Sequence, residues 1–201
     1  MPWLGPGCVR CALPLTGVSD GVCGRCLRKP PPLQHSIAAL RYESWASALI
    51  HQFKFHRDLR VGRLLSDSLA SLVAAHYRER ALPQLILPVP LHPQRLYERG
   101  FNQALELAKP LSQQFKITLP LTAATRLKNA ADQIGLSALA RRRNVRGVFQ
   151  INAALPRHIA IIDDVVTTGA TVLELAKTAR RHGAEIIDVW CVARTTINVT
   201  I

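Results

Sequence analysis

The sequence predicts an α/β fold in which a mainly parallel sheet, flanked by helices, follows a small cysteine-rich module. Apolar runs without alternation, such as Ile159–Ile162, are typical of strands buried on both faces, as in a parallel sheet. Segments with helical spacing of apolar residues alternate with these runs. Four of the five cysteines precede the run Lys29–Pro32, whose prolines break regular structure.

This proline run marks the expected boundary between two parts, residues 1–32 and residues 33–201. With 201 residues and 48% hydrophobic content, the chain is long enough for one sizeable core and a small appendage. No apolar stretch is long enough to span a bilayer, and the N-terminus lacks the regions of a signal peptide. We therefore expect a cytoplasmic protein without membrane insertion. The sequence does not indicate its oligomeric state.

The cysteines form two close pairs, Cys8 with Cys11 and Cys23 with Cys26, separated by eleven residues. Four thiolates in this arrangement suit a closed tetrahedral Zn²⁺ site, although the spacer is slightly shorter than in most zinc ribbons. Because four thiolates leave no open position, the zinc would be structural. Two disulfides are the alternative, which a cytoplasmic location disfavours. Cys191, alone in an apolar run, is expected to be buried.

Strands are expected at Ser36–Tyr42 and Leu85–Leu91 as well as at Ile159–Ile162, and helices at Ser44–Phe53 and Leu59–Tyr77. The apolar residues at helical spacing are expected to face the core. In the two helices they are Trp45, Leu49 and Phe53, and then Val61, Leu64, Leu65, Leu69, Leu72 and Val73.

The segment after the last of these strands carries the strongest functional pattern. Asp163 and Asp164 follow the strand, then comes the hydroxyl-rich turn Thr167–Thr171, and then a helix. In open α/β sheets, ligands bind beyond the carboxyl ends of strands. The carboxylates there can accept hydrogen bonds from ribose hydroxyls or hold Mg²⁺, and the turn offers N–H groups to an anion.

Two details of the following helix are predicted as well. Thr171 and Glu174 have the spacing of a capping box. Its buried face should contain Val172, Leu175, Ala176 and Ala179. The alternative to a ligand site is a buried strand whose acids cap a loop. A P-loop NTPase with a Walker B strand is unlikely, because the chain has no G-x-x-x-x-G-K-[ST] loop.

A second strand also leads into a polar loop and then a helix. After Leu91 and His92 come Arg95 and Arg99, which can bind a diphosphate, and then Asn102, a candidate N-cap. Beside the strand at Ile159–Ile162 this segment would form the opposite wall of one cleft. Standing alone, it would be interpreted as a solvated basic turn.

Basic residues are concentrated in a third segment, 126–149, within a chain of net charge +13. We expect a flexible loop at Asn129–Gly135 and a helix at Leu136–Val145. One interpretation is a lid, including Lys128, that closes on a diphosphate and excludes water. Another is a groove for single-stranded nucleic acid, and the third is a solvated helix face. The tentative nucleic-acid contacts are Arg141, Arg142, Arg143 and Arg146.

Residues 159–171 closely resemble the 5-phosphoribosyl-1-diphosphate (PRPP) motif of type I phosphoribosyltransferases. The order of features along the chain resembles the ComF family, in which a phosphoribosyltransferase domain follows a cysteine-rich zinc module. The matching pieces are the two cysteine pairs, Pro88–Leu91, Arg99–Gln103, Gln133 with Arg142–Asn144, and Ile161–Thr171.

The resemblance implies a type I phosphoribosyltransferase-like fold and a transferase that uses PRPP with Mg²⁺. Asp163 and Asp164 would orient the ribose, and Lys128 would act from the lid. The residues expected to bind PRPP are Val165, Val166, Thr167, Thr168, Gly169, Ala170, Thr171, Leu91, His92, Arg95 and Arg99.

The resemblance also implies a role in DNA uptake or utilisation, as in natural competence. Single-stranded DNA and other DNA-processing proteins are the partners expected from it. Two alternatives stay open: a DNA-binding adaptor without turnover, and a regulator that senses PRPP. No motif in residues 1–60 identifies the acceptor of a phosphoribosyl group.

Overall fold

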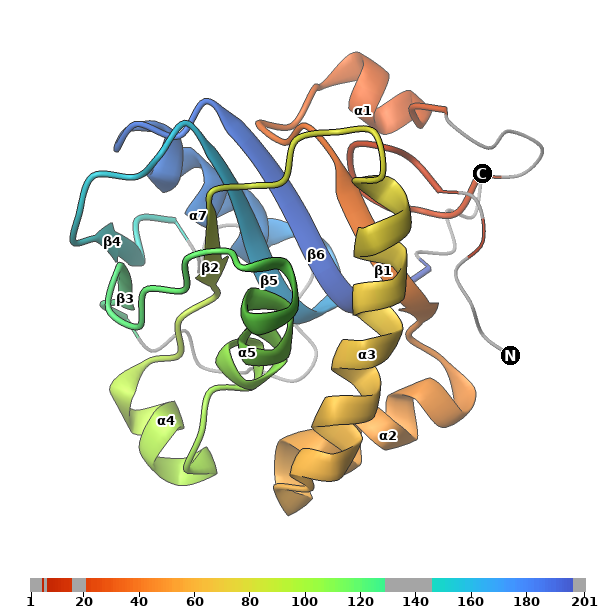
Figure 1. The fold of residues 1–201 in the computed structure, drawn as a ribbon, viewed down its shortest axis with the longest axis vertical. Helices are drawn as coiled ribbons and strands as arrows, with labels where there is room; N and C mark the ends of the chain where they lie inside the picture. The colour runs from red at the N-terminus through yellow and green to blue at the C-terminus, as the bar shows by residue number, and fades with distance from the viewer. Residues whose placement is uncertain (1–4, 6, 16–20, 129–145, 197–201) are drawn as a thin grey trace.

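The computed structural model describes residues 5, 7–15, 21–128 and 146–196 and has a parallel sheet at its centre (Figure 1). The four strands lie in the order β1-β6-β5-β2, and each neighbouring pair is parallel. Their bounds are β1 Ser36–Arg41, β2 Leu85–Pro88, β5 His158–Val166 and β6 Ile186–Arg194. The predicted α/β class with a mainly parallel sheet is confirmed.

Helices cover both faces of this sheet. In Figure 1, α3 (Leu59–His76) and α5 (Gln103–Phe115) lie in front of it and α7 (Ala170–Arg180) lies behind. Because α2 (Ser44–His56) and α4 (Pro93–Arg99) follow β1 and β2, both lie at the carboxyl edge, the lower end in Figure 1. The remaining described elements are α1 (Gly24–Arg28) and the antiparallel pair of β3 (Ala124–Arg126) and β4 (Phe149–Ile151).

The core consists of the strands and the inner faces of these helices. Strand residues such as Ile159 and Trp190 are fully buried, as the unbroken apolar runs predict. The buried face predicted for α7 is confirmed at all four positions, and Cys191 is buried as expected. Within the described part of the chain, no helix combines the length and apolar character needed to cross a membrane.

Two predicted core positions are wrong. Leu64 of α3 is 57% exposed, since the helix turns Leu65 and Leu69 toward the sheet instead. In α2 the buried face is Ala46, Ile50 and Phe53, which leaves Trp45 exposed. The spacing of large apolar residues predicted that Trp45 is buried. In the structure the neighbouring small residue, Ala46, is buried instead.

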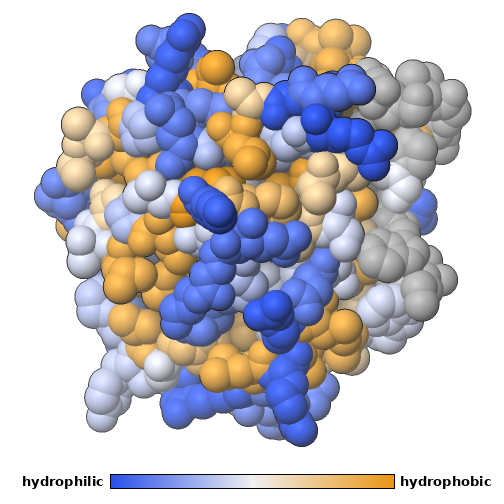
Figure 2. All heavy atoms as spheres, in the orientation of Figure 1, coloured by the Kyte–Doolittle hydropathy of each residue, from blue (hydrophilic) through white to orange (hydrophobic). Residues whose placement is uncertain are grey.

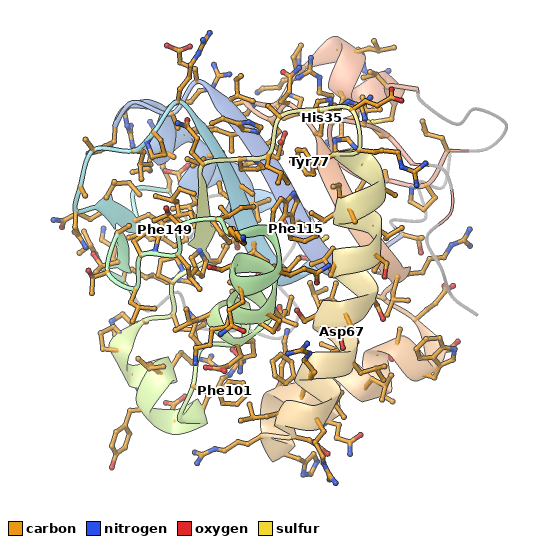
Figure 3. The ribbon with its side chains drawn as sticks, viewed as in Figure 1. His35, Asp67, Tyr77, Phe101, Phe115 and Phe149 are labelled. Atoms are coloured by element: carbon orange, nitrogen blue, oxygen red, sulfur yellow. The ribbon has the colours of Figure 1, made fainter. Side chains whose placement is uncertain are left out.

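Gly62 of α3 determines how closely α2 approaches. A Cβ atom at Gly62 would lie 2.5 Å from Cε2 of Phe53, so only glycine permits this contact. On its other side, the Phe53 ring lies 5.4 Å from the ring of Phe101, which is labelled in Figure 3. The two contacts fix the position of α2 beneath the carboxyl edge.

The bounds of two strands differ from those expected. The strand from Leu85 ends at Pro88 instead of Leu91. The N–H of Val89 still donates to the carbonyl of Ile162 at 2.9 Å, but Pro90 has no N–H with which to continue the pairing. Conversely, β5 continues through both aspartates to Val166, since β6 pairs with it as far as Arg194. The strand therefore includes residues 163–166, which lie between the predicted strand and the predicted turn. The loop and helix expected over residues 129–145 lie outside the described residues.

A buried polar cluster ties the sheet to α3 at the amino edge of β6. Asp188 is 1% exposed and accepts a hydrogen bond from the hydroxyl of Tyr77 at 2.5 Å. It also contacts Nε2 of His158 at 2.7 Å and Nδ1 of His35 at 3.3 Å. Figure 3 shows Tyr77 at the end of α3 with His35 beside it. Burial alone would raise the pKa of Asp188, but these partners outweigh it and lower the pKa.

Candidate functional site

The carboxyl end of β5 turns sharply into α7 through residues 167–169, which we call the β5–α7 loop. Gly169 adopts a φ of +78°, in the left-handed region that favours glycine, and it is the N-cap of α7. Thr168 Oγ1 accepts a hydrogen bond from the N–H of Ala170 at 3.3 Å. This places a helix N-terminus, whose first N–H groups have no carbonyl partner within the helix, next to the two carboxylates.

The predicted capping box does not form. Because Gly169 is the N-cap, Thr171 is already the second residue of α7. Glu174 instead accepts a hydrogen bond from the N–H of Gly147 at 2.8 Å. The acid thus holds the chain just before β4 against α7 and does not close the helix end.

Asp164 forms an ion pair that the sequence did not reveal. Its Oδ2 lies 2.8 Å from Nζ of Lys54 in α2, and only 7% of the residue is exposed. Since the predicted helix stopped at Phe53, Lys54 was left outside it. The signal available in the sequence was topological: α2 follows β1, so its residues lie at the edge where β5 ends.

The neighbouring carboxylate, that of Asp163, has a raised pKa. Burial raises the pKa of Asp163 to about 7, and the negative charge of Asp164 adds to this effect, while Lys54 and Arg126 oppose it. Arg126, in β3, is a second residue that the sequence reasoning missed. Successive residues of a strand point to opposite faces, so the two carboxylates leave β5 on different sides.

The segment predicted to be the second wall contains α4. His92 caps this helix, and its Nδ1 lies 3.3 Å from the N–H of Gln94. Arg95 pairs with Glu98 at 3.9 Å. The guanidinium carbon of Arg99 lies 5.5 Å from the centre of the Phe55 ring, so α4 contacts the end of α2 that carries Lys54. The structure therefore places α2 in contact with both segments.

On either side of α4, the chain is partly buried and one predicted helix cap is confirmed. Leu91 and His92 are half-buried just before α4. The Asn102 side chain caps α5, as predicted, with Oδ1 accepting from the N–H of Ala104 at 2.9 Å. Its Nδ2 donates to the carbonyl of Val89 at 3.1 Å. This bond anchors the end of β2 to the start of α5.

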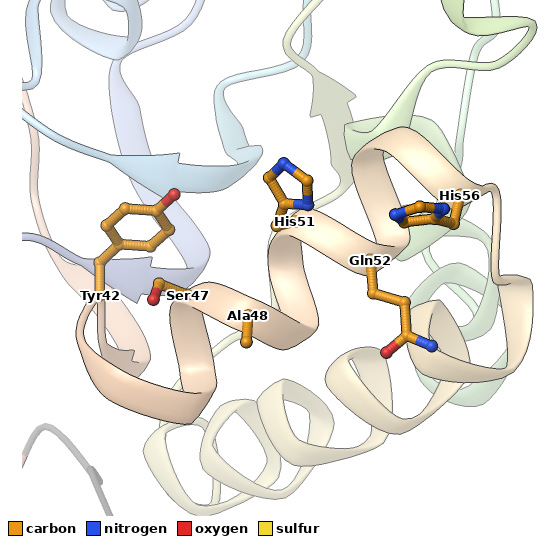
Figure 4. A pocket seen from close by; sticks show the side chains of 6 residues that line it. All are labelled: Tyr42, Ser47, Ala48, His51, Gln52 and His56. Carbon is orange, nitrogen blue, oxygen red and sulfur yellow. The ribbon is translucent and has the colours of Figure 1, made fainter.

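An open pocket of about 670 Å³ lies along α2. Its lining residues come from the end of β1 and from this helix: Tyr42, Ser47, Ala48, His51, Gln52 and His56. Figure 4 shows Tyr42 and His51 projecting to the same side of α2. The same helix also supplies Lys54, which pairs with Asp164. Helix α2 therefore both lines the pocket and contacts the carboxylate of Asp164.

The basic segment is described only at its ends. Lys128 is exposed just after β3, and its carbonyl accepts a hydrogen bond from Nε of Arg126 at 3.3 Å. Arg146 is exposed in the turn before Gly147. The other three tentative nucleic-acid contacts, Arg141, Arg142 and Arg143, lie outside the described residues.

The four N-terminal cysteines converge as predicted. Their Sγ atoms all lie within 4.8 Å of one another, and none is in a disulfide. Burial raises the pKa of Cys8, but N–H donors, led by that of Cys23, outweigh it and bring the pKa to about 7. Burial raises the pKa of Cys11 to about 11. A donor set of four close thiols fits a tetrahedral metal ion, which stabilises the thiolates.

No family model matches the chain. Among solved structures, the chain is similar to a purine phosphoribosyltransferase from Pyrococcus horikoshii, with 18% identity, a TM-score of 0.41 and coverage of 79% and 78% of the two chains. It is also similar to a hypoxanthine-guanine phosphoribosyltransferase from Leishmania tarentolae, with 15% identity, a TM-score of 0.35 and coverage of 66% of each chain.

Curated relatives are much more similar in sequence. The DNA utilization protein YhgH of Escherichia coli O157:H7 is 43% identical over 192 residues, covering 94% of this chain and 84% of that protein. Competence protein F of Haemophilus influenzae is 36% identical over 178 residues, covering 86% and 78%. These matches span the carboxyl-edge site and most of the chain. The chain belongs to the ComF family, together with these two proteins.

Proposed function

We propose that this chain is a PRPP-binding, phosphoribosyltransferase-type protein that serves DNA utilisation. The observation that carries the proposal is the segment Asp163–Thr171 at the carboxyl end of β5. Two carboxylates, a left-handed glycine and a helix N-terminus follow one another there. The names of its relatives, DNA utilization protein and competence protein, support the cellular role.

Each part of the site matches one part of PRPP. The carboxylates of Asp163 and Asp164 accept hydrogen bonds from the ribose hydroxyls, and the N–H groups of residues 167–171 bind the 5-phosphate. Arg95, Arg99 and the backbone at Leu91–His92 bind the diphosphate. Oxygen ligands of this kind also suit Mg²⁺, which when bound neutralises part of the diphosphate charge.

In the transfer, the bond between C1 of the ribose and the diphosphate oxygen breaks, and a nitrogen of the acceptor bonds to C1. Diphosphate leaves with the electron pair, and the acceptor nitrogen gives its proton to solvent or a base. The protein contributes position and charge stabilisation. Lys54 is a positioning residue, since it holds Asp164 at 2.8 Å until a ribose hydroxyl replaces it.

Diphosphate release from PRPP across a panel of nucleobases and amines tests the catalytic part of the proposal. An acceptor that produces stoichiometric diphosphate would identify the reaction. Binding of PRPP with Mg²⁺ but no release with any acceptor would favour a PRPP-sensing regulator. Absence of PRPP binding in calorimetry would contradict the whole site assignment.

We further propose that the four cysteines bind structural Zn²⁺ and that the protein works in the cytoplasm. Free thiols in a cluster suit a reducing compartment. Metal analysis of protein purified without added zinc tests the first part. We expect about one zinc ion per chain in the native protein and loss of this zinc in Cys11→Ser. Native protein that contains no zinc would contradict the proposed zinc site.

A second candidate function is binding of single-stranded DNA, favoured by aromatic residues exposed among arginines. Tyr97 of α4 is 89% exposed, and Phe55 of α2 is 57% exposed beneath the guanidinium of Arg99. Figure 2 shows that hydrophobic and hydrophilic side chains are interspersed on the side of the molecule seen in Figure 1. Exposed aromatic rings can stack on bases while basic residues contact phosphates.

The test is fluorescence anisotropy of a labelled oligonucleotide at several salt concentrations. Tyr97→Ala should weaken binding several-fold, and affinity should fall steeply with salt. Leu121→Ala, at a 70% exposed apolar residue, is the control. Binding that is absent, or that ignores both salt and Tyr97, would exclude this function for α4.

A further inference from the structure

Two arginines hold the β5–α7 loop from the side opposite its N–H groups. Arg194, at the end of β6, is only 2% exposed, and its Nη1 donates to the carbonyl of Val166 at 2.8 Å and to that of Thr167. Arg25, in α1, donates from Nη2 to the carbonyl of Thr168 at 3.4 Å. Guanidinium groups therefore contact three consecutive carbonyls at the start of the loop.

These bonds orient the loop. A trans peptide is planar, so its carbonyl oxygen and its N–H point in opposite directions. Fixing the carbonyls of residues 166–168 therefore turns the N–H groups of residues 167–169 away from the arginines. An anion site of this kind depends on N–H groups that converge on one point. The arginines thus prearrange the donors without touching the ligand.

The same arginines are attached to the cysteine cluster. Nε of Arg194 donates to the carbonyl of Cys11 at 3.0 Å, and Arg25 stands in the sequence between Cys23 and Cys26. Among the described residues, every hydrogen-bond acceptor of Arg194 is a backbone carbonyl or the hydroxyl of Thr195. No carboxylate therefore takes part in these hydrogen bonds.

A pocket of about 480 Å³ lies between the cluster and the loop. Its lining includes Cys11, Arg25, Thr168 and Arg194. Because a cavity occupies this space, close-packed apolar side chains do not connect the cysteine cluster to the β5–α7 loop there. The hydrogen bonds of the two arginines do.

We propose that Arg194 and Arg25 are positioning residues through which the metal-bound state of the cysteine cluster sets the affinity of the β5–α7 loop for a sugar 5-phosphate. The inference rests on the proposed function and on zinc binding by the cysteines. Metal removal separates the two cysteine pairs, which shifts the Cys11 carbonyl and α1 and so releases the loop carbonyls. The 5-phosphate then loses its prearranged donors, whereas the diphosphate, held by α4, does not.

Calorimetry with two separate probes tests this: ribose 5-phosphate for the loop, and inorganic diphosphate with Mg²⁺ for the other wall. Both are titrated into metal-loaded protein, metal-stripped protein, and the variants Arg194→Met, Arg194→Lys and Arg25→Met. Arg28→Met is the matched control, because it removes the same charge from an exposed position of α1. Zinc content and circular dichroism are measured on every sample.

We expect affinity for ribose 5-phosphate to fall roughly tenfold in stripped protein, in Arg194→Met and in Arg25→Met, the size of one net hydrogen bond. Affinity for diphosphate should stay within about twofold in the same samples, and Arg194→Lys should recover part of the loss. Arg25→Met, which buries no new group, should keep its zinc and its fold.

Three results would overturn the inference. In the first, both ligands weaken in parallel, which indicates general destabilisation. In the second, ribose 5-phosphate binding is unchanged in stripped protein and in both methionine variants. In the third, loaded wild-type protein binds neither ribose 5-phosphate nor PRPP, a result that overturns the proposed function as well and so is distinguishable from the other two.

Discussion

At the scale of single residues, two aspartates on neighbouring strands have opposite pKa shifts. Asp163 lies at the carboxyl edge beside another carboxylate, and burial and that charge raise its pKa to about 7. Asp188 is buried too, but three hydrogen-bonding side chains lower its pKa. The raised pKa of Asp163 is typical of a group at a ligand site, whereas the lowered pKa of Asp188 is typical of a group that stabilises the fold.

Asp163→Asn should increase the free energy of unfolding at pH 8. The pKa of Asp163 is higher in the folded than in the unfolded state, so ionisation destabilises the fold as pH rises from about 4 to about 7. The neutral amide avoids this cost. The free energy of unfolding should therefore rise by on the order of 1–4 kcal/mol above pH 7 and should hardly change near pH 4. Urea unfolding at both pH values measures it. An equal effect at both would contradict the raised pKa.

Tyr77→Phe should make the protein more sensitive to acid. The lowered pKa of Asp188 stabilises the fold above the unfolded value, near pH 4, and this stability is lost as pH falls below it. Removing the hydroxyl 2.5 Å from Asp188 costs about 1–2 kcal/mol and moves acid unfolding to higher pH. Tryptophan fluorescence follows the transition, with Tyr97→Phe, at an 89% exposed position, as the control. Identical acid midpoints would refute the role of Tyr77.

Residues whose role depends on the local chain were predictable, and residues whose role depends on packing were not. The acid pair, Gly169 and the four cysteines stand in short patterns that carry their own chemistry. Lys54 and Arg194 act on partners more than 25 positions away along the chain, and no pattern in the sequence connects them. The capping box was wrong because the left-handed Gly169 already ends the loop.

At the scale of elements, α2 is the part that brings the site together. It carries Lys54 to Asp164, contacts Arg99 through Phe55 and lines the open pocket. Its amphipathic pattern predicted the helix and the burial of Phe53 correctly, but it predicted burial of Trp45, where Ala46 is buried instead. The strands were predicted from their apolar runs, while their ends depended on neighbours: β5 lengthens because β6 pairs with it.

Gly62→Ala should therefore disturb the site from a distance. The added Cβ would lie 2.5 Å from Phe53 and push α2 away from α3, at a cost of about 1–3 kcal/mol. The ion pair between Lys54 and Asp164 should loosen, and affinity for PRPP should fall. Urea unfolding and calorimetry measure both effects. Ser71→Ala, at an exposed position of α3, is the control, and equal behaviour of the two variants would show that α2 does not depend on this contact.

At the scale of the whole molecule, the order of motifs predicted the family, and the relatives confirm it. The net charge of +13 fits either PRPP or DNA, and charge alone does not choose between them. The acceptor was not predictable, because no motif in residues 1–60 identifies a base or an amine. The central claim is that the carboxyl edge of the sheet binds PRPP.

The most direct test compares PRPP binding with Mg²⁺ in wild-type protein, Asp164→Asn and Asp67→Asn. Asp67, labelled in Figure 3, is an exposed acid of α3 that pairs with Arg63 at 2.9 Å, so its variant removes one negative charge away from the site. Wild-type protein and Asp67→Asn should bind PRPP alike, and Asp164→Asn should bind at least about tenfold more weakly. Equal binding by all three proteins, or no binding by any, would contradict the account.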